Sequence, residues 1–484
     1  MNKELKRVSI IVLLMFIALF ASSSVIQVVA ADNLGSDPRN VRTLYDSFSA
    51  QRGPILVDGV AIAQSEPVDD NFSYLRVYSN GPLYAPITGY FTLNQGNTGI
   101  EGALNDYLSG TSNAQFFDQI NSIFTGQAPK GDAVETTIDP VVQQAAWDAL
   151  GENSGSVVAL DPKTGAILAM VSKQSFDPNL LAVHDTGSVL EAYDALNDDP
   201  AKPLNNRAIG GDLYTPGSVF KLVVAAAAFE SGNYTPDSVF PNPPTLTLPE
   251  STSVITNSEG GSCGGGDTVS IATALRLSCN IPFAQLGLAL GYDAIEKKAA
   301  EFGFGSSLDI PTSTTPSTYP PTDSDAEQML SSFGQASVRV TPLQIAMVSS
   351  AIANGGVLMQ PTLVESILAP DLTVREALQP TVYNTPMTSE TAATLTEMMT
   401  NGVSNGVASN ARISGVAVAG KTGTAENGKG EPYTLWFTGF APADDPEVVV
   451  AVVVENGGGR GQSGFGNTVA APIAKKVLEA VLNK

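Results

Sequence analysis

The strand-like segments of this chain fall into two groups separated by a long, mainly helical region, and this spacing restricts the fold more than any other feature. The first group comprises residues 155–160 and 166–172, which the turn sequence over 161–165 joins as a hairpin. The second group comprises three segments with a strand pattern, 416–424, 434–440 and 447–454. An amphipathic helix over 470–482 follows this group. We therefore predict an α/β (α+β) fold in which both groups complete one five-stranded antiparallel sheet covered by helices.

Two helix signals accompany the first group of strands. Asp139 has the residue type typical of a helix cap, and a proline follows it at the first position of a helix predicted over 140–150. A second helix opens with Pro-Gly and continues through apolar residues over 216–230. Ser218 and Lys221 therefore lie in the first turn of this second helix, on the same face.

The N-terminus carries one long apolar segment. Residues 1–7 contain three basic residues and one acidic residue, whereas residues 8–31 contain no charge. About 20 apolar residues are enough to cross a bilayer, and basic residues in front of such a segment favour a cytoplasmic N-terminus. We expect a cytoplasmic tail over 1–7, a transmembrane signal anchor over 8–31, and the rest of the chain outside the cytoplasmic membrane. A cleaved signal peptide is the alternative, because Val29-Ala-Ala31 resembles a cleavage site.

The charge balance excludes a nucleic-acid partner from our expectations. The 484 residues include 25 Lys and Arg against 48 Asp and Glu, for a net charge of −23. Contacts to phosphates need clustered basic residues, and the sequence contains no such cluster. The chain is long enough for two or three domains, and we expect a smaller N-terminal domain of short strands and turns over 32–135, followed by a larger domain over 136–484.

The chain contains two cysteines, Cys263 and Cys279, in the region expected outside the cytoplasm. Thiols in an oxidising compartment pair readily, and no other partner is present in the sequence. We expect these two residues to form a disulfide, with two free thiols as the alternative.

Ser218 and Lys221 form a Ser-x-x-Lys motif that is the only match of its kind in the chain. A Ser-His-Asp triad would have to use His184, the single histidine, which we expect to be an ordinary surface or loop residue. A lysine one turn from a serine can accept the proton of its hydroxyl once burial and a second cation have lowered the pKa of the amine. The motif thus predicts Ser218 as a nucleophile and Lys221 as its base.

Two weaker motifs follow, and each has a rival elsewhere in the chain. Ser-x-Asn occurs at 278–280 but also at 231–233, where it is more simply a helix end. Lys-Thr-Gly occurs at 421–423 but also at 163–165, in a predicted turn. We favour Lys421 because a residue within a strand projects its side chain from the sheet at a fixed height.

In the order Ser218-x-x-Lys, Ser278-x-Asn and Lys421-Thr-Gly, the chain resembles penicillin-binding proteins and serine β-lactamases. Further segments are similar to the penicillin-binding transpeptidases and extend the resemblance over nearly everything after the apolar N-terminus; these are 137–140, 160–165, 177–179, 206–208, 214–221, 333–335, 341–344 and 436–440. Upstream, Arg52-Gly-Pro-Ile55 and Gly99-Ile-Glu101 resemble the pedestal of class B penicillin-binding proteins, with a short pedestal similar to that of the actinobacterial penicillin-binding protein A group. The resemblance implies a penicillin-binding transpeptidase fold on an N-terminal pedestal.

The resemblance implies a serine acyl-enzyme mechanism. Ser218 would attack the carbonyl between the two terminal D-alanines of a peptidoglycan stem peptide, and Lys221 would take its proton. The backbone N–H groups of Ser218 and Thr424 would form the oxyanion hole. An amine of a second stem peptide would then resolve the acyl-enzyme.

The resemblance also assigns supporting roles to the second and third motifs. Ser278 would relay a proton to the departing D-alanine, and Asn280 would hold the substrate amide. Lys421 would keep Lys221 neutral and attract the substrate carboxylate. The strand that carries Lys421 would complete the substrate site with Thr422, Gly423 and Thr424. The implied partners are stem peptides, β-lactam antibiotics, the membrane through 8–31, and proteins of cell-wall synthesis or division; no metal or organic cofactor is implied.

Three other functions share parts of this signature. A β-lactamase would need a deacylating Glu followed four residues later by Asn, well before the third motif. The one such pair between Ser278 and Lys421, Glu397 with Asn401, lies too near the third motif. A D,D-carboxypeptidase would use water as the acceptor, which the pedestal resemblance disfavours. A division scaffold or β-lactam-binding protein with little turnover is the alternative of a different class.

Overall fold

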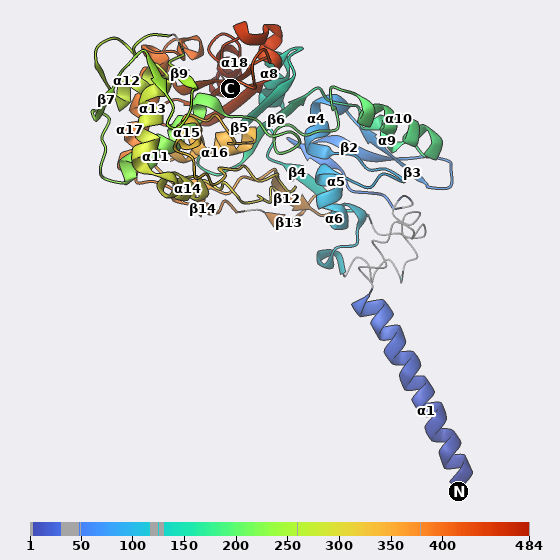
Figure 1. Ribbon diagram of the computed structural model, residues 1–484. Coiled ribbons are helices and arrows are strands. Elements are labelled where there is room, and N and C mark those ends of the chain that lie inside the picture. Colours follow the sequence, from blue (N-terminus) through green and yellow to red (C-terminus); the bar gives the residue numbers. More distant parts are fainter. Residues whose placement is uncertain are drawn as a thin grey trace.

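The computed structural model describes residues 3–30, 50–116, 130–258, 260–377 and 379–483, together with residues 48 and 124. Helix α1 (Lys3–Ser24), which continues into a π-helical turn η1 (Val25–Val29), stands apart from the folded body (Figure 1). Residues Leu5–Gln27 are long and apolar enough to cross a membrane, and none of this span is buried. The segment predicted as an anchor is therefore helical and exposes its apolar side chains.

The larger lobe is built on the five-stranded antiparallel sheet that the sequence predicts. Its order is β15-β16-β17-β5-β6, and every neighbouring pair is antiparallel. The strands are β5 (Gly155–Leu160), β6 (Ile167–Lys173), β15 (Ala419–Ala425), β16 (Thr434–Ala441) and β17 (Val448–Val454). β17 is an unbroken run of valine and alanine and is fully buried, because helices cover both faces of the sheet.

One face of the sheet packs against the helices that begin and end this lobe. They are α8 (Pro140–Leu150) and α18 (Ala470–Leu482), both with the bounds that the sequence predicts. Asp139 caps α8, and its Oδ1 accepts hydrogen bonds from the backbone N–H groups of Val141 and Val142. The buried side chains of α8 and α18 share a hydrophobic core with the sheet, and this core closes the face to solvent.

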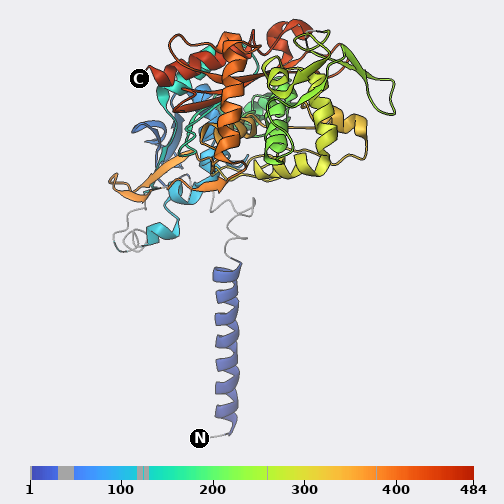
Figure 2. The same cartoon turned by 90° about the vertical axis from the view of Figure 1, so that its left-hand side faces the viewer.

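The opposite face packs against α16 (Pro342–Ala353) and the helical region between the two strand groups. The helices of that region are α11 (Lys221–Glu230), α12 (Ile271–Arg276), α13 (Asn280–Leu290), α14 (Tyr292–Glu301), α15 (Asp325–Ser331) and α17 (Ser389–Ser404). Short strands and 3₁₀ turns complete this lobe: η3 (Gly217–Phe220), β7 (Val239–Pro241), β8 (Thr245–Thr247), β9 (Val254–Thr256), β10 (Thr268–Ser270), β11 (Leu358–Met359), β14 (Val382–Asn384), η4 (Ser409–Ala411), η5 (Asn456–Gly459) and η6 (Gly461–Ser463). Figure 2 shows the helices stacked beside the sheet.

The pedestal contains a second sheet, of six strands, that the sequence did not predict in full. Its order is β13-β12-β4-β1-β2-β3. Four strands come from the N-terminal part of the chain: β1 (Ile55–Val57), β2 (Val60–Pro67), β3 (Tyr74–Tyr78) and β4 (Ala133–Thr136). The other two, β12 (Val364–Leu368) and β13 (Val374–Ala377), belong to the region expected to be mainly helical. The predicted division between 135 and 136 therefore falls within β4, and this sheet contains strands from both sides of it.

Short helices complete the pedestal and its contact with the larger lobe. They are α4 (Gly81–Thr88), α5 (Gly99–Ala103), α6 (Asn105–Ser109), η2 (Asn113–Gln115), α9 (Asn179–Ala182) and α10 (Thr186–Asp198). Asn179, at the start of α9, exchanges two hydrogen bonds with the backbone of Tyr78 in β3. Residues from the larger lobe thus extend the pedestal on this side, as Figure 1 shows for α9 and α10.

A buried charge cluster joins the two short pedestal motifs that the sequence singled out. Glu101 accepts hydrogen bonds from Arg52 Nη2 at 2.8 Å, Arg76 Nε at 2.5 Å and the Tyr78 hydroxyl at 3.2 Å. Burial alone would raise the pKa of Glu101, but the positive charges of Arg76 and Arg52 outweigh it and hold that pKa below its usual value. The carboxylate is fully buried and stays ionised, so the cluster ties α5 to β3 and to the segment before β1.

Candidate active site

The three sequence motifs meet at one cleft beside the edge strand β15. A cavity of about 460 Å³ opens there, and Ser218, Ser278, Thr422 and Thr424 all line it. Ser218 lies in η3, Ser278 precedes α13, and the two threonines lie on β15. Segments far apart in the sequence therefore contribute to one groove.

Ser218 does not lie in the first turn of a regular α-helix, as predicted, but in a tighter 3₁₀ turn. Gly217 has a φ of +55°, which favours glycine, and its backbone N–H donates to the carbonyl of Gly334 at 2.8 Å. α11 begins only at Lys221. The tight turn brings the backbone beside β15, since a Cβ added to Gly217 would lie 3.0 Å from the Thr424 carbonyl oxygen.

Lys221 connects the first motif with the second. Its side chain is fully buried, and Nζ donates hydrogen bonds to the carbonyl oxygen of Ser278 at 2.8 Å and to Asn280 Oδ1 at 2.9 Å. Within the described residues no hydrogen bond joins Nζ to the Ser218 hydroxyl, although the two residues lie one turn apart. Such contacts commonly tighten only when substrate is bound.

Burial holds the pKa of the Lys221 amine well below its usual value of 10.5, and the charge of Lys421 lowers it further. The rings of Phe283 and Phe333 lie 5.5 Å and 5.9 Å from Nζ and exclude water from it. A buried, neutral amine is the form of lysine that can accept a proton. Burial and the charge of Lys421 therefore both favour the neutral form that is required of a lysine base.

Lys421 connects the third motif with the second. Its Nζ donates to Ser278 Oγ at 2.7 Å and to the carbonyl oxygen of Thr422 at 2.7 Å. Burial lowers the pKa of Lys421 from 10.5 to about 7. The sequence-based expectation treated Lys421 as a fixed positive charge, whereas in the folded protein this amine itself titrates near neutral pH.

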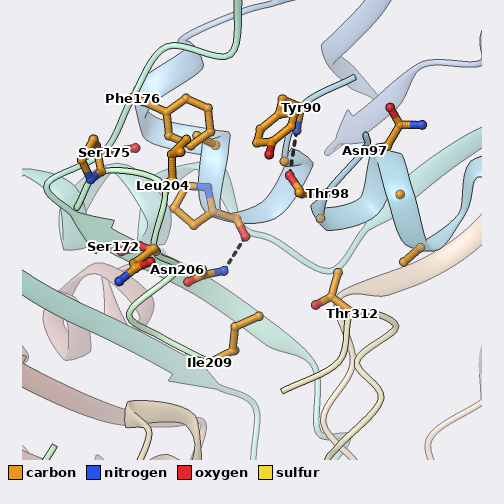
Figure 3. A pocket seen from close by; sticks show the side chains of 18 of the residues that line it. Tyr90, Asn97, Thr98, Ser172, Ser175, Phe176, Leu204, Asn206, Ile209 and Thr312 are labelled. Carbon is orange, nitrogen blue, oxygen red and sulfur yellow. Dashed lines mark hydrogen bonds between the residues drawn. The ribbon is translucent and has the colours of Figure 1, made fainter. Parts of the chain in front are cut away.

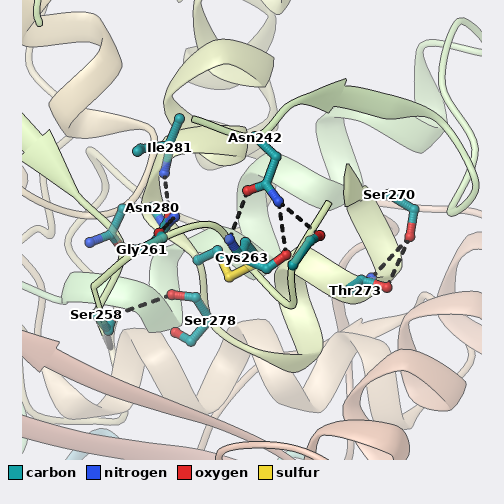
Figure 4. The surroundings of a disulfide bond; sticks show 12 residues. Asn242, Ser258, Gly261, Cys263, Ser270, Thr273, Ser278, Asn280 and Ile281 are labelled. Atoms are coloured by element: carbon teal, nitrogen blue, oxygen red, sulfur yellow. Dashed lines mark hydrogen bonds between the residues drawn. A yellow bond between two sulfur atoms is a disulfide. The ribbon is translucent and has the colours of Figure 1, made fainter. Parts of the chain in front are cut away.

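The second motif is held in a constrained backbone. Ser278 has a φ of +59°, in the left-handed region, and it directly precedes the cysteine of a Cys263–Cys279 disulfide with a Cα–Cα distance of 5.9 Å (Figure 4). Asn242 fixes the other half of the disulfide, because its side chain accepts from the Cys263 N–H at 2.7 Å and donates to the Cys263 carbonyl at 3.0 Å. The disulfide therefore joins the loop before β10 to the start of α13.

Asn257 also supports the second motif, and the sequence analysis missed it. Its Oδ1 accepts hydrogen bonds from the backbone N–H groups of Asn280 at 3.0 Å and Ile281 at 3.1 Å, so it caps α13 from a distant segment. Its Nδ2 donates to the Gly261 carbonyl at 3.0 Å. No local pattern around Asn257 signals this role, because the capping residue normally adjoins its helix.

The third motif packs closely against the turn that contains Ser218, and the contact is tightest at Gly423. A Cβ added to Gly423 would lie 3.0 Å from both the Pro216 carbonyl oxygen and the Trp436 Cβ. The Thr424 hydroxyl accepts a hydrogen bond from the Gly466 N–H at 3.3 Å, and Thr422 faces the same cavity. The glycine allows the backbone of β15 to approach Ser218.

The rival motifs lie elsewhere in the structure. Lys163 is in a surface turn, where it pairs with Asp445 at 2.6 Å. Ser231 and Asn233 are exposed at the end of α11. His184 pairs with Asp70 of the pedestal at 2.5 Å. None of these residues lines the Ser218 cleft.

A serine in a tight turn, a buried lysine one turn away and a second lysine on the adjacent strand define a class of proteins, the active-serine acyltransferases to which penicillin-binding proteins and serine β-lactamases belong. Residues 155–479 match the penicillin-binding protein transpeptidase domain, and residues 52–134 match the penicillin-binding protein A dimerisation domain. The chain therefore belongs to the penicillin-binding protein transpeptidase family.

Named relatives resemble the chain over its whole length. Peptidoglycan D,D-transpeptidase PbpA of Mycolicibacterium smegmatis is 43% identical over 493 residues, with 100% of both chains covered. PbpA of Mycobacterium tuberculosis is 42% identical, over 100% of this chain and 99% of that one. The structure of penicillin-binding protein A from M. tuberculosis as a penicillin G acyl-enzyme complex has a TM-score of 0.84 and 41% identity, and covers 90% of this chain and 100% of that one.

Proposed function

We propose that this protein is a peptidoglycan D,D-transpeptidase in which Ser218 is the nucleophile. Lys221 accepts the proton of the Ser218 hydroxyl as the oxygen attacks the carbonyl between the two terminal D-alanines of a stem peptide. The C–N bond breaks, D-alanine leaves with a proton, and a Ser218 ester remains. The observation that carries this proposal is the buried Lys221 amine, since burial lowers its pKa and so favours the neutral form that a base requires.

The second and third motifs support the remaining steps. Ser278 passes a proton to the leaving amine, a role supported by the hydrogen bond that its hydroxyl accepts from Lys421 Nζ at 2.7 Å. Asn280 holds the substrate amide beside Lys221, and the Thr422 and Thr424 hydroxyls receive the substrate carboxylate at the wall of the cleft. The N–H groups of Ser218 and Thr424 serve as the oxyanion hole, where one donor is worth about 3–4 kcal/mol in a serine protease.

The acceptor in the second half of the reaction is an amine of another stem peptide, which attacks the ester and releases Ser218. The match to PbpA proteins over the whole chain, pedestal included, favours this acceptor over water. We further propose that α1 anchors the protein in the cytoplasmic membrane with residues 32–484 outside, and that the pedestal contacts proteins of cell-wall synthesis or division.

The nucleophile is tested by covalent labelling with a fluorescent penicillin. The wild-type protein should be labelled stoichiometrically, and Ser218→Ala should not be labelled. Product analysis with a stem-peptide donor and an amine acceptor should give the crosslinked product. Stoichiometric labelling of Ser218→Ala at the same site would refute the assignment, and release of D-alanine without any crosslinked product would favour a carboxypeptidase.

A further inference from the structure

A second large cavity, of about 580 Å³, lies where the pedestal meets the larger lobe. We call it the junction cavity. Its walls come from the end of α4, the start of α5, α10, the loop over 203–209 and residues 312–313. Figure 3 shows Tyr90 and Thr98 of the pedestal near Leu204, Asn206 and Thr312 of the larger lobe. It shares no lining residue with the Ser218 cleft. Its volume is within the range of about 300–1,000 Å³ that is common for small-molecule sites.

Every residue that lines the junction cavity is uncharged, although the chain as a whole carries a net charge of −23. Three aromatic rings contribute apolar surface: Tyr90, Phe176 and Tyr193. The rings of Tyr90 and Phe176 meet edge to face with centroids 5.9 Å apart (Figure 3). Without a basic residue in its walls, this site offers no counter-charge to a phosphate or carboxylate.

The same walls carry polar groups that have no hydrogen-bond partner among the described residues. Asn97, Asn197 and Asn205 line the cavity, and within the described part of the chain their side-chain amides form no hydrogen bond. The Thr312 hydroxyl is buried and has no partner among the described residues. By contrast, the amide of Asn206 is committed to a backbone carbonyl of α4 at 2.7 Å (Figure 3). Asn97 and Asn197 are exposed at the edge of the cavity, whereas the Thr312 hydroxyl is buried. A buried polar group without a partner is unfavourable, so a ligand that pairs with the Thr312 hydroxyl gains affinity.

We propose that the junction cavity binds a neutral acetamido sugar, of the kind that forms the glycan strand of peptidoglycan. The C–H face of a sugar ring packs on aromatic surface, and its hydroxyl and acetamido groups can both donate to and accept from asparagine amides. The absence of charged lining residues favours a neutral glycan over a stem peptide, whose carboxylates would lack a counter-charge. The choice of sugar rests on the proposed function, since a peptidoglycan transpeptidase meets such a strand at its substrate.

The test is titration of the full-length protein in detergent with chitotriose, a trimer of N-acetylglucosamine. Cellotriose is the matched control, because it has the same linkage without acetamido groups. We expect chitotriose to bind and cellotriose to bind at least roughly tenfold more weakly, since a site built for amide groups is left unpaired by their loss. Absence of chitotriose binding at millimolar concentration would overturn the proposal.

Two isosteric variants locate the binding. Asn97→Asp and Asn197→Asp each keep the size of the side chain but remove its N–H donors at the exposed edge of the cavity, and each should weaken chitotriose binding by up to roughly tenfold, the loss expected for one hydrogen bond. Asn94→Asp is the control, because Asn94 is exposed in the same loop as Asn97 but does not line the cavity. Thermal unfolding of all three variants checks that they fold. Equal binding by every variant would overturn the proposal.

Acylation separates this site from the Ser218 cleft. Protein that has been acylated with penicillin should bind chitotriose with unchanged affinity, because the two cavities share no residue. Loss of chitotriose binding after acylation would show that the sugar occupies the Ser218 cleft and would overturn the proposal. Failure of penicillin to label Ser218 would refute the proposed function instead. The titration with chitotriose does not depend on labelling and would still test the junction cavity.

Discussion

Replacement of Asn257 by alanine tests whether a residue outside all three motifs positions the acylation site. The Asn257 side chain is 4% exposed and is the acceptor for the backbone N–H groups of Asn280 and Ile281. Asn280 Oδ1 and the Ser278 carbonyl in turn accept the two hydrogen bonds from Lys221 Nζ. Asn257→Ala therefore removes the support of the atoms that hold the lysine base.

The magnitude follows from the two hydrogen bonds that are lost. A buried N–H without an acceptor costs about 1–3 kcal/mol, and loss of a helix cap costs about 0.5–2 kcal/mol. Asn280 is half-buried beside the cleft, so water reaches one of the two N–H groups. We expect the free energy of unfolding to fall by about 2 kcal/mol. If about 1.4 kcal/mol of this loss appears as an increase in the activation free energy of acylation, the acylation rate falls about tenfold.

Two measurements check this expectation. Denaturant unfolding of the full-length protein in detergent gives the change in stability, and stopped-flow labelling with a fluorescent penicillin gives the second-order acylation rate. Asn257→Asp keeps the acceptor oxygen and should recover part of the rate. Asn233→Ala, an exposed asparagine in the rival motif, is the control and should change neither quantity. Wild-type acylation by Asn257→Ala, or an equal defect in Asn233→Ala, would refute the reasoning.

Three further predictions concern charge, covalent support and backbone space. The pKa of Lys421 is about 7 in the folded protein and 10.5 in its usual range, so between these pH values the unfolded state binds more protons and the free energy of unfolding should rise with pH. Denaturation measured at several pH values should show a shallower rise for Lys421→Met than for the wild type. An equal slope in both proteins would contradict the assigned pKa. The Cys263→Ser, Cys279→Ser double variant removes a disulfide between residues 16 positions apart, and its free energy of unfolding should fall by about 3 kcal/mol. The same denaturant experiment measures this change, and a stability equal to that of the wild type would contradict the prediction. Gly217→Ala would place a methyl group 3.0 Å from the Thr424 carbonyl oxygen, at a residue with a φ of +55°. The left-handed backbone alone costs an alanine about 1–2 kcal/mol, so penicillin labelling should slow by more than about tenfold. Normal labelling kinetics would show that the turn has room to adjust.

Much of the larger lobe was predictable because its signals are local. The valine run of β17, the Asp-Pro cap of α8 and the amphipathic pattern of α18 each lie within one segment, and neighbouring residues alone set backbone preference and periodicity. The five-stranded sheet followed from the order of such segments. The strands β12 and β13 were missed because both are short, β13 is largely exposed, and the two buried residues of β12, Val364 and Ile367, do not alternate with period two, so the apolar alternation that marks a half-buried strand is weak.

The sequence by itself determined the chemistry that is available: one Ser-x-x-Lys pair, two candidate partners for each further motif, and one possible disulfide. Only the tertiary structure decided which candidates meet. It places Ser278 and Lys421 beside Lys221, whereas Lys163 lies on the surface. It also decided the proton affinity of the two site lysines and the supporting role of Asn257. The physical reason is that burial, charge proximity and hydrogen-bond partners arise between segments distant in sequence, where no local pattern records them.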